Sequence, residues 1–173
     1  MGSFAPLFTM PLLKTSELEA VNRVLQMLGE APVNSLSGQF GLAKQAQDSL
    51  TDVSRRVQAE GWSFNTDYQV TITPDANKNL LVGSNVSRVV VDILAYPDYD
   101  IIERKGKLYD RLNQTFEFTD DVKADLTYMY DWDELPEHAR QYIMTRAGRQ
   151  LQEAILGSPD LTKLNIAAEA EAR

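Results

Sequence analysis

The segment that decides the fold is VQAEGWSFNTDYQVTITP, residues 57–74. Up to Gly61 the apolar residues recur at helical spacing, whereas beyond it Tyr68, Val70 and Ile72 alternate with polar residues. Glycine adopts the left-handed conformation without strain, so Gly61 is well placed to end a helix just before a strand begins. The chain therefore contains both helices and β-structure.

Two amphipathic helices are predicted upstream of this change. The first spans about residues 17–28, where Ser16 and Glu19 have the spacing of a capping box and Gly29 can end the helix. The second spans about residues 42–60 and carries one apolar stripe: Ala43, Ala46, Leu50, Val53 and Val57. Each helix has one apolar face and therefore requires a partner surface.

Downstream, several short strands are predicted in addition to residues 68–72. They are residues 80–82, 87–94, 101–104, 107–111 and 125–130. Lys105-Gly106 is typical of a tight turn between two of them. Because a parallel crossover needs a dozen or more residues, the short connections favour antiparallel pairing.

Helical periodicity returns at Pro136 and continues to about Leu156, where Gly157-Ser158-Pro159 ends it. A short alanine-rich helix is expected at residues 161–173. The predicted fold class is α+β: a helical bundle formed by the N- and C-terminal helices, with an inserted antiparallel β unit. The predicted parts are an N-terminal arm (1–15), the bundle (16–61 and 136–173) and the β region (62–135).

Composition excludes several classes of protein. The 173 residues include no cysteine and one histidine, which removes disulfides and thiolate metal sites and fits a reducing cytoplasm. No run of 18 apolar residues occurs, so no membrane association is expected. Residues 92–134 hold twelve acids and five bases of a chain with net charge −8. Because phosphate binding requires clustered basic residues, specific nucleic-acid binding is disfavoured.

The sequence contains one cluster with catalytic residue types: Asp131, Asp133, Glu134 and Glu137 around Trp132. Paired carboxylates are what a glycoside hydrolase uses, but acidic residues also stabilise the first turn of a helix. His138, the single histidine, is expected on the surface, and no metal or cofactor is predicted. Arg140, Arg146 and Arg149 are expected on a solvated or intersubunit face, paired with carboxylates.

Three groups of residues resemble the tail tubular protein A family, which forms the adaptor ring of short-tailed bacteriophages. They occur in the family's order: Glu17-Leu18-Glu19-Ala20-Val21-Asn22 with Leu28-Gly29-Glu30-Ala31-Pro32-Val33; Gly61-Trp62-Ser63-Phe64-Asn65; and Asp131-Trp132-Asp133-Glu134-Leu135-Pro136-Glu137. The resemblance implies a non-enzymatic virion protein, assembled in the host bacterial cytoplasm. It implies a dodecameric ring between the capsid portal and the tail nozzle (tail tubular protein B), with tail fibres or spikes nearby.

As a ring subunit, the chain would form part of the DNA-ejection channel and let DNA pass without specific binding. An acidic wall repels DNA, so some of five aspartates are expected to face this channel: Asp98, Asp100, Asp120, Asp121 and Asp125. The alternative is that these acids serve solubility or pair with basic patches on the nozzle and fibres. Three apolar residues near the C-terminus are expected to dock on a partner: Leu161, Leu164 and Ile166. Trp62 and Phe64 are expected at the hinge between helix and sheet. Two alternatives are a tail-associated glycan hydrolase using the carboxylates near Trp132 and another head-completion or neck protein.

Overall fold

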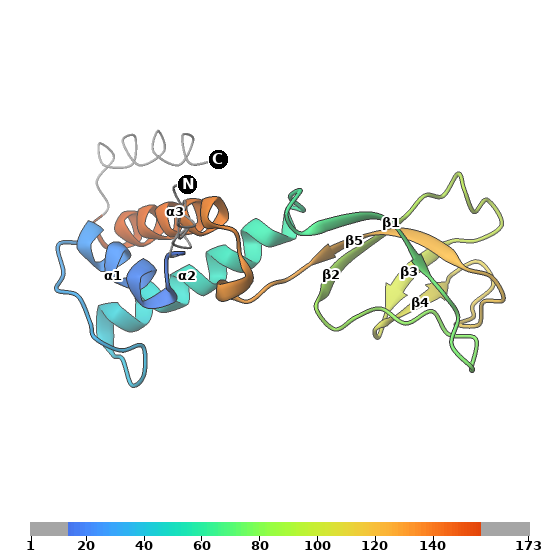
Figure 1. Ribbon diagram of the computed structural model, residues 1–173, viewed down its shortest axis with the longest axis horizontal. Helices are drawn as coiled ribbons and strands as arrows, with labels where there is room; N and C mark the ends of the chain where they lie inside the picture. Colours follow the sequence, from blue (N-terminus) through green and yellow to red (C-terminus); the bar gives the residue numbers. More distant parts are fainter. Residues whose placement is uncertain (1–13, 157–173) are drawn as a thin grey trace, which may run out of the picture.

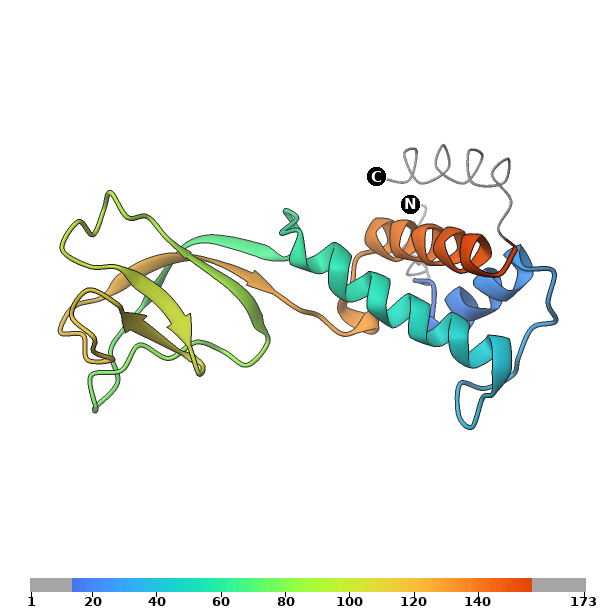
Figure 2. The ribbon, with the colours of Figure 1, turned by 180° about the vertical axis from the view of Figure 1, so that it is seen from behind.

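The computed structural model describes residues 14–156, which form two units placed end to end (Figure 1). The helical unit contains α1 (Glu17–Met27), α2 (Gly41–Ala59) and α3 (Glu137–Leu156). The β unit lies at the other end, and the chain passes between the units twice, after α2 and before α3 (Figure 2). The α+β prediction is confirmed: helices from both ends of the chain flank an antiparallel β region.

Local sequence signals define both ends of α1. The Ser16 side chain accepts a hydrogen bond from Glu19 N–H, and the Glu19 carboxylate accepts one from Ser16 N–H at 2.8 Å. Gly29 follows the helix with a φ of +79°, and Glu30 N–H donates to Leu25 O at 3.0 Å. The left-handed glycine thus lets the chain turn back and satisfy a carbonyl at the end of the helix.

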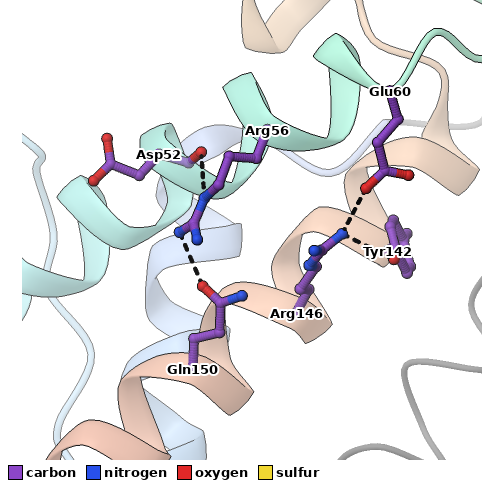
Figure 3. A network of polar contacts seen from close by, with 6 residues as sticks. All are labelled: Asp52, Arg56, Glu60, Tyr142, Arg146 and Gln150. Carbon is purple, nitrogen blue, oxygen red and sulfur yellow. Dashed lines mark hydrogen bonds and ion pairs between the residues drawn. The ribbon is translucent and has the colours of Figure 1, made fainter.

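The apolar faces of the three helices form one hydrophobic core. Its buried members include Val21, Val24, Leu50, Val53, Val57, Leu135, Ile143 and Ala147. Two polar contacts also join α2 and α3 (Figure 3). Arg146 forms an ion pair with Glu60 at 2.9 Å, and Arg56 donates a hydrogen bond to Gln150 at 3.0 Å. No helix in the described part of the chain is long and apolar enough to cross a membrane.

The β unit has a three-stranded antiparallel sheet of order β1-β5-β2. Its strands are β1 (Thr66–Ile72), β2 (Val86–Val91) and β5 (Val122–Tyr128). The hairpin of β3 (Ile101–Arg104) and β4 (Lys107–Asp110) turns at Lys105-Gly106, as predicted. A second core closes this unit, with Ile72, Leu80, Leu108, Phe118, Val122, Ala124 and Leu126 buried.

A buried carboxylate organises the turn after β4. Asp110 is fully buried and accepts hydrogen bonds from Asp100 N–H at 3.0 Å, Leu112 N–H at 2.9 Å and the Asn113 amide at 2.6 Å. Burial raises the pKa of Asp110, but these hydrogen bonds lower it more, so the net shift is downward. The ionised carboxylate therefore stabilises the folded turn.

Three strand predictions were wrong in detail. The strand expected at residues 125–130 begins three residues earlier and ends two residues earlier, as β5. Residues 80–82 form no strand, because they pair beside β4 at one position, Leu81 with Lys107. There Leu108 N–H donates to Leu80 O and Val82 N–H donates to Gly106 O, both at 2.9 Å. Residues 92–94 lie outside β2, since Asp92 accepts from Leu94 N–H at 2.9 Å and turns the chain. The sequence also did not predict the β-bulge in β1, where Gln69 has a φ of +55°.

Candidate functional site

The acidic cluster lies where β5 leads into α3, around the short helix η1 (Trp132–Glu134). The Glu134 carboxylate accepts from Asp131 N–H at 3.2 Å, and the Trp132 indole N–H donates to Thr15 O at 2.9 Å. Glu137 accepts from Thr15 N–H at 2.9 Å and from the Thr15 hydroxyl at 2.5 Å. These contacts cap the strand-to-helix connection and attach the start of the described chain to α3.

The protonation state of Glu137 suits this structural role. Burial raises its pKa, but hydrogen bonds from Gln141 and Thr15, with nearby Arg140, lower it more, and the net pKa lies below the ordinary glutamate value. A general acid at a glycosidic bond requires a raised pKa. Glu137 is therefore ionised at neutral pH and holds Thr15.

The prediction that Arg140 lies on a solvated face was wrong. Its side chain is 3% exposed and donates to three backbone carbonyls, those of Leu135 (3.0 Å), Thr15 (2.7 Å) and Asp133 (2.6 Å). The guanidinium also lies 5.8 Å from the centre of the Trp132 ring. The five donors of arginine suit it to joining several chain segments at once. By contrast, Arg146 and Arg149 form the predicted ion pairs, with Glu60 and Glu153.

The structure does not bring the four acids together in one cavity. A groove of about 400 Å³ lies beside Trp132, and Asp131 lines it, but Asp133, Glu134 and Glu137 do not. Residues 14–156 also contain no group of three or more histidine or acidic side chains arranged to hold a metal ion. His138 is exposed, and its ring contacts Phe64 edge-on at 5.9 Å. The geometry thus favours the structural interpretation of this cluster.

Buried side-chain amides form a hydrogen-bond network at the junction of the two units, where α2 ends beside β1 and β5. We call this junction the neck, and Gln58 is at its centre. This α2 side chain is 2% exposed, and its amide donates to Tyr130 O at 3.1 Å and accepts from Tyr130 N–H at 2.7 Å. One side chain thereby pairs both backbone groups of Tyr130, as a neighbouring strand would. The sheet pairing of β5 is thus continued onto the end of α2.

Asn65 makes the second half of the neck. It is 1% exposed, and its amide donates to Gln58 O and Tyr128 O, both at 2.8 Å, while its side-chain oxygen accepts from Trp62 N–H at 2.8 Å. Gln58 and Asn65 together link the end of α2, the start of β1 and the end of β5. We call these two residues and their partners the neck latch.

Sequence reasoning placed the aromatic part of this junction but missed its polar part. Trp62 and Phe64 are half-buried and pack against the helical core, and Trp62 lies 5.7 Å from Tyr142 between ring centres. Asn65 was quoted only as part of the family motif, and no structural role was predicted for Asn65 or Gln58. The available signal was a glutamine next to the stripe residue Val57, near the end of the helix.

The five aspartates expected to face a channel differ in their surroundings. Asp98, Asp120 and Asp121 are exposed, in the loops of the β unit. Asp100 forms an ion pair with Arg111 at 2.8 Å, and Asp125 accepts from the bulged Gln69 N–H at 2.8 Å. Asp100 and Asp125 thus have structural partners within the chain, and the exposed three remain candidates for a surface role. The candidate docking residues Leu161, Leu164 and Ile166 lie outside the described residues.

The comparison with known proteins agrees with a structural role for the acidic cluster around Trp132. A model of the tail tubular protein family matches residues 18–173. Tail tubular protein A of Klebsiella phage KP34 is 31% identical over 155 residues, which cover 90% of this chain and 81% of that protein. The chain belongs to the tail tubular protein family and is a structural component of a bacteriophage tail.

Proposed function

We propose that the chain is the subunit of an adaptor ring that joins the capsid portal to the tail nozzle. The observation that carries this proposal is the form of the molecule. Two units, each with its own hydrophobic core, are held end to end by the neck latch. A subunit of this form presents two different surfaces at a fixed separation, as a connector between two other rings requires.

The proposal includes a dodecamer, assembled in the host cytoplasm, with tail fibres or spikes attached near its junction with the nozzle. It is tested by imaging particles of the phage that encodes the chain and by measuring the mass of the purified assembly. We expect a ring of twelve copies between portal and nozzle. A tail that contains the chain at another position, or in another copy number, would contradict the adaptor role.

We further propose that the β unit lines part of the DNA-ejection channel. Exposure of Asp98, Asp120 and Asp121 supports this lining, because carboxylates close to the axis repel the phosphates of passing DNA. At physiological salt the repulsion extends over about 8 Å, so only residues near the channel surface contribute. Replacing the three by lysine should slow DNA ejection, whereas Asp52→Lys on the exposed face of α2 should not. Equal ejection kinetics in both variants would exclude this lining.

Attachment to the portal or to a neighbouring subunit is assigned to Leu161, Leu164 and Ile166. Deletion of residues 161–173 should abolish attachment while the remaining chain still unfolds cooperatively, because residues 14–156 by themselves supply two clusters of buried apolar side chains. Loss of the cooperative transition in the truncated protein would instead make this segment part of the fold.

A further inference from the structure

The loop before α2 presents an exposed aromatic side chain. Phe40 is 87% exposed, the largest value among the large apolar side chains of the described residues. The loop itself is ordered by local hydrogen bonds: Gln39 donates to Ser35 O at 2.6 Å, and Ser37 N–H donates to the Ser35 hydroxyl at 3.1 Å. We call residues 35–40 the Phe40 loop. It lies at the end of the helical unit that is far from the β unit (Figure 1).

Phe40 occupies a position for which phenylalanine is a poor choice. It is the N-cap residue of α2, where Ser, Thr, Asp or Asn would accept a hydrogen bond from the free amides of the first turn. The phenylalanine ring forms no such bond and remains almost entirely exposed. A residue that neither caps the helix nor packs within its own chain breaks a local preference without compensation, which is typical of a functional position.

A groove of about 950 Å³ lies between α1 and α3 on another part of the same unit. Its lining includes Met27, Met144, Asn22, Gln26, Gln141 and Thr145. Methionine side chains adapt to an aromatic ring and make favourable sulfur–ring contacts. The segment that carries the lining residue Pro32 is held against α1, because the Asn22 side chain pairs with both backbone groups of Val33, at 2.8 and 3.0 Å. We call this the α1–α3 groove.

We propose that Phe40 of one copy inserts into the α1–α3 groove of the next copy. This inference rests on the proposed ring and identifies its subunit contact. The Phe40 loop projects from the side of the helical unit opposite α3 in both views (Figures 1 and 2). Two different surfaces of one chain then meet, which is the head-to-tail contact that closes into a ring when the rotation is right. The loop carries no charge. The groove offers two methionines for the aromatic ring and neutral amides for the polar loop residues, and the charged side chains Glu19, Arg23 and Glu30 also line it.

The contact can be tested by disulfide cross-linking, because the native chain has no cysteine. Phe40→Cys is combined with Thr145→Cys on the α3 side of the groove or with Gln26→Cys on its α1 side, and the full-length chain is oxidised after assembly. A disulfide needs Cβ atoms about 4 Å apart, so it reports direct contact. We expect a ladder of covalent oligomers. Each single variant, and Phe40→Cys with Leu81→Cys on the exposed β unit, should give none.

The other occupants of the groove would give different results. Dimers from Phe40→Cys alone would show that two loops meet each other and would overturn the proposal. A bond within one chain between Phe8→Cys and Thr145→Cys, with no ladder from the Phe40 pair, would assign the groove to residues 1–13. If imaging shows rings but the Phe40→Cys pairs give no ladder of covalent oligomers, this contact is refuted and the adaptor function is unaffected. Particles that lack the chain would refute the adaptor function and, with it, this contact.

A second measurement uses side-chain size at the same position. Phe40→Ala should weaken association between copies by about 10- to 100-fold, as removal of a central aromatic anchor does, whereas Phe40→Leu should retain most of it. Thermal unfolding of dilute protein should change little in either variant, since the Phe40 side chain is 87% exposed and contributes little to packing among residues 14–156. Unchanged association of Phe40→Ala would overturn the proposal.

Discussion

Replacing Gln58 by alanine removes the centre of the neck latch. The buried amide pairs both Tyr130 N–H and Tyr130 O, at 2.7 and 3.1 Å, and also donates to the Ser54 hydroxyl at 3.1 Å. Alanine preserves the helix propensity of α2 but leaves both backbone groups of Tyr130 without their partner. The loss should therefore act on the connection between the two units more than on either core.

The magnitude follows from the two unpaired groups. A buried donor or acceptor left without a partner costs about 1–3 kcal/mol. Tyr130 is half-buried and lines the groove of about 400 Å³, so water can replace part of the lost pairing and the lower end of that range applies. Gln58→Ala should lower the free energy of unfolding by about 2–3 kcal/mol.

Gln58→Glu tests the donor half of the latch separately. The introduced carboxylate can accept from Tyr130 N–H, but it cannot donate to Tyr130 O unless it is protonated. Burial and the facing carbonyl raise the pKa of the introduced group above its unfolded value of about 4.3. The variant should thus approach native stability below about pH 4 and lose stability as pH rises through the raised pKa.

Urea unfolding at equilibrium, followed by hydrogen exchange at the Tyr130 amide, measures both effects. Gln45→Ala is the matched control, because Gln45 is an exposed glutamine on the same helix and should change stability by no more than about 0.5 kcal/mol. If Gln58→Ala costs no more than Gln45→Ala and leaves Tyr130 equally protected, the latch does not hold the neck.

Three further predictions concern single residues. Gly29→Ala should lower the free energy of unfolding by about 1 kcal/mol, because the φ of +79° is strained for alanine, and urea unfolding with Gly29→Asn as the milder variant measures this. Arg140→Leu should cost about 3 kcal/mol, because Asp133 O loses its donor while Thr15 O and Leu135 O each lose one of two donors. Full recovery of the melting temperature in Arg140→Lys would contradict the idea that the planar guanidinium is needed to reach all three carbonyls. Because the folded pKa of Asp110 is lowered, its stabilisation is present above about pH 4 and lost as pH falls through the folded pKa. Asp110→Asn should flatten the acid-unfolding profile between pH 2 and 5, and an unchanged slope would contradict this assignment.

Elements with local signals were predictable from the sequence. The capping box of Ser16 and Glu19 and the helix stop at Gly29 depend on residues within a few positions of each other, so their spacing is sufficient. Arg140 was assigned wrongly because its partner Thr15 lies 125 residues away. Arginine is usually exposed, and its burial here depends on the carbonyls that come together where Thr15 lies beside Asp133 and Leu135.

The sequence by itself determined the three helices of residues 14–156 and the location of most strands, because the apolar period and the glycines act over one or two turns of chain. It also carried the ordered motifs by which the family is recognised. The tertiary structure decided how the two units are joined, since Gln58 and Asn65 acquire a role only when α2 ends beside Tyr128 and Tyr130. It likewise decided that Phe40 remains exposed while α1 and α3 form a groove elsewhere, because burial depends on contacts between segments far apart in the chain.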